Sequence, residues 1–114
     1  MKNLQKISLY FFALSLSIPF GSHIAQAQSV DEQGKKLFTQ KAVPACAYCH
    51  SLKHADSMAE SGPDLDSLKP NAATIENAIR HGRGEMPAIT GLSDEEIKVL
   101  VKYLQNVAGQ ADKK

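Results

Sequence analysis

The hydrophobic and polar positions along the chain predict three amphipathic helices. Apolar residues three or four positions apart recur over about residues 30–40, 72–81 and 94–107. The last of these segments has the clearest pattern, with one apolar face formed by Ile97, Leu100, Val101 and Leu104. Because no segment shows the sustained alternation of a β-strand, we expect an all-α fold.

Polar residues at the helix ends support these boundaries. The pairs Ser29 with Glu32 and Ser93 with Glu96 have the spacing of a capping box, in which each side chain bonds the backbone N–H of the other residue. Gly82 follows the middle segment and is typical of a helix end. The three helices should therefore be separated by two long loops, both rich in Gly and Pro.

The first 27 residues have the pattern of a secretory signal peptide. Lys2 and Lys6 precede an apolar run from Ile7 to Ile18, and the segment ends in small residues at Ala25-Gln26-Ala27. The run is shorter than the ~20 residues that a membrane-spanning helix needs. We therefore expect cleavage after Ala27 and a mature domain of residues 28–114 in the periplasm. The alternative is an uncleaved membrane anchor.

Composition gains meaning once the signal segment is set aside. The whole chain has 114 residues, with 13 Lys and Arg against 12 Asp and Glu, and the mature domain keeps 11 against 12. With so small a net charge, the protein lacks the positive electrostatic field of a nucleic-acid binder. The whole chain has 43% hydrophobic residues, which is too many for a disordered tail. The mature domain retains only three aromatic residues, Phe38, Tyr48 and Tyr103. So small a core with long loops predicts a stabilising cross-link or cofactor.

Both cysteines of the chain lie in one motif, Cys46-Ala47-Tyr48-Cys49-His50. C-x-x-C-H is the attachment sequence of c-type haem, in which two thiols form thioethers with one porphyrin and the histidine ligates its iron. A thioredoxin-like redox pair would need strands around it, zinc would need wider ligand spacing, and a disulfide across two residues would stabilise little. The motif predicts one covalently bound haem c.

A sixth iron ligand must come from elsewhere in the domain. Met58 and His54 follow His50 by only eight and four residues, which is too close in sequence to reach the opposite face of the ring. Met86 lies 36 residues after His50, in a segment whose two glycines let the backbone approach a flat cofactor and whose proline, Pro87, stiffens the turn after the ligand. We expect Met86 and His50 to be the axial ligands, with His81 or an open site as alternatives.

Together these residues resemble a small bacterial class I cytochrome c over about residues 30–108. Beyond Cys46 to His50, Gly62-Pro63-Asp64-Leu65 is similar to the segment after the family's haem turn, and Met86-Pro87 is similar to its ligand loop. The resemblance implies three to five short helices around the haem, with the terminal helices crossed and brought close by Gly34. It also implies that the Pro63 carbonyl accepts a hydrogen bond from the His50 ring.

With both axial positions filled, iron has no free site for a substrate, so we expect single-electron transfer between redox proteins and no catalysis. Two alternatives remain, a haem subunit of a multisubunit periplasmic oxidoreductase and a sensor or peroxidase-like enzyme with a displaceable sixth ligand. Four lysines either steer a partner to the haem edge or form an ordinary solvated surface, namely Lys35, Lys36, Lys41 and Lys53. Arg80 and Arg83 either pair with a haem propionate or are solvated.

Overall fold

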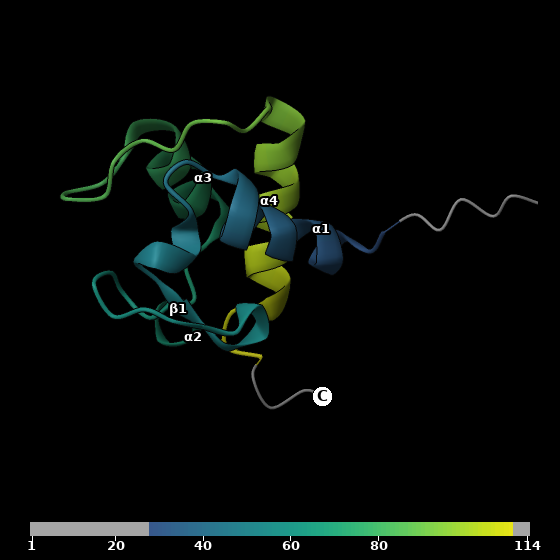
Figure 1. Ribbon diagram of the computed structural model, residues 1–114, viewed down its shortest axis with the longest axis horizontal. Coiled ribbons are helices and arrows are strands. Elements are labelled where there is room, and N and C mark those ends of the chain that lie inside the picture. The colour runs from purple at the N-terminus through teal and green to yellow at the C-terminus, as the bar shows by residue number, and fades with distance from the viewer. Residues whose placement is uncertain (1–27, 111–114) are drawn as a thin grey trace, which may run out of the picture.

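The computed structural model describes residues 28–110, so the predicted signal peptide lies outside it, as do residues 111–114. Helix α1 (Val30–Lys36) continues into a π-helical turn (Leu37–Lys41), and the chain then folds back through short elements before its two longest helices (Figure 1). The elements that follow are a 3₁₀ turn (Cys46–Tyr48), β1 (Ser51–Leu52), a second 3₁₀ turn (Lys53–Ala55), β2 (Ser57–Met58), α2 (Leu65–Leu68), α3 (Ala72–His81) and α4 (Asp94–Val107).

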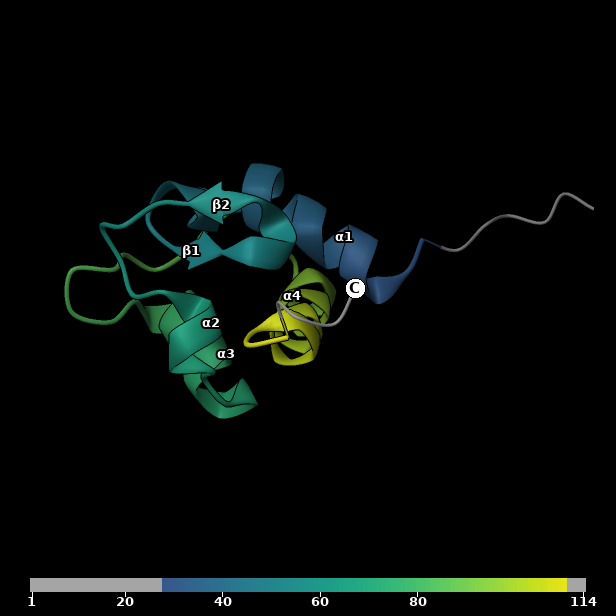
Figure 2. The ribbon, with the colours of Figure 1, turned by 90° about the horizontal axis from the view of Figure 1, so that it is seen from below.

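Helices α1 and α4 cross, as Figures 1 and 2 show, and they pack most closely at Gly34 and Tyr103. A Cβ atom added to Gly34 would lie only 2.1 Å from the Cβ atom of Tyr103. The backbone of α1 therefore rests directly on the fully buried Tyr103, whose hydroxyl lies 3.0 Å from Nδ1 of His54. The predicted crossing of the terminal helices is confirmed.

The hydrophobic core lies where α3 and the π-helical turn pack against this crossed pair. All four residues of the predicted apolar face of α4 are buried, so that prediction is confirmed. The side chains that join them from other segments include Phe38, Leu52, Leu65, Ile75 and Ile79. The core is therefore shared by the N-terminal, middle and C-terminal parts of the domain.

The helix ends agree with the predicted caps, except that Ser29 does not form the complete capping box. Ser93 and Glu96 form both bonds of a capping box, with N···O distances of 3.2 and 2.9 Å. Ser29 Oγ accepts the backbone N–H of Glu32 at 3.2 Å, but the structure of residues 28–110 gives no return bond from Glu32, so Ser29 is a simple N-cap. Gly82, at φ +74°, ends α3 as predicted.

The segment expected to be one long loop contains short regular elements. Strands β1 and β2 pair antiparallel, with Ser51 opposite Met58, so the expectation of no strands was wrong. Each strand has two residues, and α2 has only four, which is too short for a periodic pattern to develop in the sequence. Across residues 28–110, none of the helices has the length and apolar character needed to cross a membrane.

Candidate functional site

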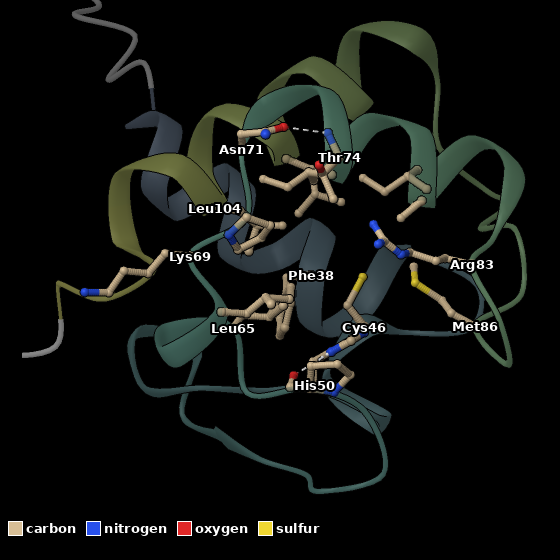
Figure 3. A pocket seen from close by; sticks show the side chains of 17 residues that line it. Phe38, Cys46, His50, Leu65, Lys69, Asn71, Thr74, Arg83, Met86 and Leu104 are labelled. Carbon is tan, nitrogen blue, oxygen red and sulfur yellow. Dashed lines mark hydrogen bonds between the residues drawn. The ribbon is translucent and has the colours of Figure 1, made fainter.

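Two hollows that share five lining residues form one site beside the core, and Figure 3 shows the side chains that line the larger one. The inner hollow, of about 630 Å³, has mainly apolar walls from α2, α3, α4 and Phe38. The outer hollow, of about 420 Å³, is bordered by Pro44, Cys49, Gly62 and Pro87. The inner volume falls in the ~300–1,000 Å³ range of cofactor pockets. The shared residues are Cys46, His50, Pro63, Arg83 and Met86.

The C-x-x-C-H residues wind into a single turn that faces this site. The carbonyl oxygen of Cys46 accepts the backbone N–H groups of both Cys49 (3.1 Å) and His50 (3.0 Å). This turn brings all three side chains to the lining of the hollows. The buried hydroxyl of Ser57 lies 3.0 Å from the carbonyl oxygen of Ala47 and 2.8 Å from that of His50, so β2 holds the turn from behind.

The two thiols occupy different environments. Cys46 is 9% exposed, and burial is the main cause that raises the pKa of its thiol to about 11. Cys49 is exposed and lines only the outer hollow, whereas Cys46 lines both. Neither cysteine is in a disulfide. The pair thus offers two sulfur atoms along one border of the combined space, as the attachment of a flat cofactor with two vinyl groups requires.

His50 is oriented by the loop that follows β2. Its Nδ1 atom lies 2.8 Å from the carbonyl oxygen of Pro63. Because a carbonyl only accepts, Nδ1 must donate, and the neutral ring keeps its lone pair on Nε2. The backbone approaches closely here, since a Cβ atom added to Gly62 would lie 2.9 Å from Cε1 of the His50 ring. His50 is therefore held in the tautomer that can ligate a metal through Nε2.

Met86 reaches the site from a tight hairpin turn after α3. The backbone N–H and C=O groups of Arg83 and Met86 bond each other at 2.9 and 3.0 Å. The turn needs glycine at Gly82 and Gly84, which have φ values of +74° and +58°, and a Cβ atom on Gly82 would lie 2.5 Å from the Met86 carbonyl oxygen. Figure 3 shows Met86 and His50 bordering the same hollow from different segments.

The other candidate ligands lie elsewhere. Met58 in β2 is 78% exposed, and the His54 ring is engaged with the Tyr103 hydroxyl. His81 at the end of α3 has Nδ1 3.0 Å from the side-chain oxygen of Asn77. None of these three candidates lines either hollow. The structure brings only Met86 of the four to the site with His50.

The four lysines considered as a steering surface do not line the two hollows. Two of them form ion pairs with carboxylates that line neither hollow, Lys35 with Asp56 at 2.5 Å and Lys41 with Glu96. Their positions give no support to a lysine ring at the border of the site. The charge that does border both hollows is Arg83, together with Glu85 in the outer one.

Two positions of the site have roles that were not recognised from the sequence. Gly62 forms a Gly-Pro dipeptide with Pro63, which marks a loop, but its contact with a ring 12 residues earlier has no local signature. Ser57 lies between Asp56 and Met58 in a segment without a periodic pattern, and it resembles any surface serine until β1 and β2 pair. Both contact the turn from Cys46 to His50, which lies earlier in the sequence and comes near only when the intervening loop folds back. Periodicity and spacing could therefore not have identified them.

This chain is similar in sequence and fold to known proteins. The family model described as cytochrome c oxidase, cbb3-type, subunit III matches residues 29–104. Cytochrome c6 of Cyanidium caldarium is 29% identical over 86 residues, which are 72% of each chain. The crystal structure of the c-type cytochrome SorU from Sinorhizobium meliloti is 41% identical, with a TM-score of 0.67 over 70% of this chain and 92% of that one. The family match includes every residue of the site from Cys46 to Met86.

Proposed function

Because the chain belongs to this family of c-type cytochromes and carries covalently bound haem c, we propose that it is a periplasmic carrier of single electrons between redox proteins. One observation supports the proposal above the others. His50 and Met86, from segments 36 residues apart, both border the two hollows, which supports their assignment as the two ligands of one iron. An iron held in this way has no position left for a substrate.

Each site residue has a distinct part in this proposal. Cys46 and Cys49 would provide the sulfur atoms of the two thioether bonds, and His50 and Met86 would ligate the iron. The Pro63 carbonyl, 2.8 Å from Nδ1, makes the His50 ring a stronger donor and fixes its tautomer. When bound, haem supplies a one-electron ferrous–ferric couple. The apolar wall formed by residues such as Leu100 and Leu104 keeps water away and favours the less charged, reduced state.

The border of the site at Cys49 faces solvent and suits brief contacts with partners. Cys49 is exposed, and two apolar residues nearby in sequence, Tyr48 and Val43, are 75% and 56% exposed. A small exposed apolar area is typical of transient redox encounters, which bury less than ~1,200 Å².

Absorption spectra of the haem-loaded protein test the ligand set. We expect a low-spin ferric spectrum at neutral pH with the charge-transfer band of methionine sulfur bound to iron. A high-spin ferric spectrum would contradict the proposal and favour a sensor or peroxidase-like enzyme with a displaceable sixth ligand. Replacement of Cys46 and Cys49 by alanine should abolish covalent attachment of the haem, which denaturing electrophoresis followed by haem staining would report.

A second candidate function is a haem subunit of a larger oxidoreductase. The observation that favours it is the description of the matching family model, which is that of an oxidase subunit. Gel filtration of haem-loaded protein from its native cells separates the two functions. A monomer that several donors reduce supports the carrier, whereas a haem-containing peak with a partner that persists through the column supports the subunit.

Export is a separate proposal that rests on the sequence of residues 1–27. Mass spectrometry of the protein from a periplasmic fraction should give a chain that begins at Gln28. A haem-loaded chain that retains Met1 and fractionates with membranes would instead show that the segment is an anchor. Neither result changes the expected ligands, because the site lies within residues 38–104.

A further inference from the structure

The inner hollow has an apolar wall and few charged side chains. Apart from Cys46 and His50, the titratable residues that line it are Lys69 and Arg83, and both are cations. Haem carries two carboxylates as well as its apolar ring, and a carboxylate moved out of water without a partner costs several kcal/mol. A cation at the wall of the hollow would offset that cost. The position of each side chain decides which of the two can do so.

Lys69 is directed away from the hollow. It ends α2 at φ +46°, and its aliphatic stem lies against Gly109, where an added Cβ atom would be 2.1 Å from Lys69 Cε. Figure 3 shows its amino group pointing outward, whereas the guanidinium group of Arg83 is turned into the hollow between Cys46 and Met86. Arg83 is therefore the cation that faces the space.

The neighbouring arginine shows by contrast that Arg83 is available. Arg80 is engaged by two carboxylates, with Nε 2.9 Å from Glu76 and Nη1 2.8 Å from Asp94. Within residues 28–110, no ion pair or side-chain hydrogen bond joins Arg83 to another residue. The sequence offers Arg80 and Arg83 as partners of a haem propionate. Arg80 is already paired with two carboxylates of the protein, whereas the guanidinium group of Arg83 can bind an anion.

The hairpin turn also fixes the direction of Arg83. Arg83 and Met86 are directly opposed and exchange both backbone hydrogen bonds. Side chains at opposed positions of an antiparallel pair lie on the same face, so the Arg83 side chain accompanies Met86 to the site. We propose that the guanidinium group of Arg83 binds a propionate of the haem. The proposal rests on the presence of haem c and does not depend on the carrier role.

Four variants of the haem-loaded protein test this proposal. Arg83→Gln removes the cation and the guanidinium fork, and Arg83→Lys keeps the charge but loses the paired N–H donors. Arg80→Gln is the matched control, and Lys69→Gln tests the other cation of the hollow. The readouts are the propionate bending vibration in resonance Raman spectra and the midpoint potential, neither of which depends on activity with a partner.

We expect Arg83→Gln to shift the propionate vibration and to lower the midpoint potential, because a positive charge near the iron favours its ferrous state. Arg83→Lys should also shift the vibration, but its midpoint potential should stay close to that of the unaltered protein because the charge is kept. Arg80→Gln should leave the vibration unchanged. If the Arg83→Gln protein contains too little haem for its spectrum to be measured, the propionate vibration of the Arg83→Lys protein tests the proposal instead. An unchanged vibration in both Arg83 variants, or a shift in Lys69→Gln alone, would overturn the proposal.

Discussion

The Nδ1 atom of His50 lies 2.8 Å from the carbonyl oxygen of Pro63, and Gly62 is what allows the loop to come so near. A methyl group at Gly62 would lie 2.9 Å from Cε1 of the ring and 3.2 Å from the Cys49 carbonyl oxygen. One of these neighbours must move to admit it. The orientation of His50, the proposed iron ligand, therefore depends on a residue that contributes no side chain.

Gly62→Ala should raise the midpoint potential of the haem. The added methyl group pushes the Pro63 carbonyl away from Nδ1, and a weaker hydrogen bond makes the imidazole a poorer donor to ferric iron. The shift should stay below ~60 mV, which is about 1.4 kcal/mol for one electron and matches the loss of a single hydrogen bond. Spectroelectrochemical titration of the variant and the unaltered protein would measure it.

Ser61→Ala is the control for this prediction, because Ser61 is exposed and adjacent to Gly62. It should leave the potential unchanged. A Gly62→Ala protein with the unaltered potential and a normal low-spin spectrum would show that the contact between the loop and the His50 ring has no influence on the iron.

Met86→Ala should lower the midpoint potential and let ferrous iron bind carbon monoxide. Thioether sulfur stabilises ferrous iron, and its removal leaves one axial position without a protein ligand. Met58→Ala is the matched control, because Met58 is 78% exposed and lines neither hollow. Absorption spectra during carbon monoxide titration would follow the change. If Met58→Ala opened the iron and Met86→Ala did not, the ligand assignment would be reversed.

The parts of this fold that depend on neighbours in sequence could be predicted from the sequence. The bounds of α4, Asp94–Val107, follow from a capping box and an apolar repeat that both lie within the helix. The haem motif is likewise contained in five residues, from Cys46 to His50. The first helix was predicted as a single unit, and its last turn is instead π-helical, a change of winding that apolar spacing does not report.

The parts that depend on loop closure could not be predicted in this way. Asp66 is buried and accepts the backbone N–H groups of Lys53 (2.8 Å) and Gly109 (2.9 Å), which joins three segments through one carboxylate. In the sequence it is one of two acidic residues beside Leu65, and nothing there distinguishes it from the exposed Asp64. The role of Arg83 could not be predicted either. Its direction depends on the opposed pair with Met86, and its availability became clear only because Arg80 is paired with two carboxylates.

Gly34→Ala should destabilise the domain even though alanine is the better helix former. In an open helix the change would gain roughly 0.5–1 kcal/mol. Here the new Cβ atom would lie 2.1 Å from the Cβ atom of Tyr103, and neither backbone can move without opening the helix crossing. Overpacking typically costs about 1–3 kcal/mol, so the net free energy of unfolding should fall.

Urea unfolding of the haem-loaded proteins would measure this loss. Lys36→Ala serves as the control, because Lys36 is exposed on the same helix and an exposed substitution should change stability by about 0.5 kcal/mol or less. A Gly34→Ala protein as stable as the unaltered one would mean that α1 and α4 can separate at no cost.

Glu96→Gln should make stability less dependent on pH in the acid range. A hydrogen bond from Lys41, with a smaller contribution from the Ser93 backbone, lowers the pKa of Glu96 below its ordinary value of 4.5. A carboxylate with a lowered pKa in the folded state stabilises that state above its ordinary pKa, and this contribution is lost as the pH falls through the folded value. The Glu96→Gln protein lacks the contribution at every pH.

Urea unfolding at low salt between pH 7 and pH 3 would show the effect as a difference between two proteins. Glu96→Gln should be the less stable at pH 7, and the difference should shrink once the pH falls below about 4.5. The amide oxygen of glutamine can still accept the N–H of Ser93, so the comparison isolates the charge.

Glu95→Gln is the control. The Glu95 side chain is 82% exposed on the same turn, so this variant should show a smaller difference at pH 7. A difference for Glu96→Gln that stays constant down to pH 3 would mean that the contact with Lys41 does not stabilise the fold through charge.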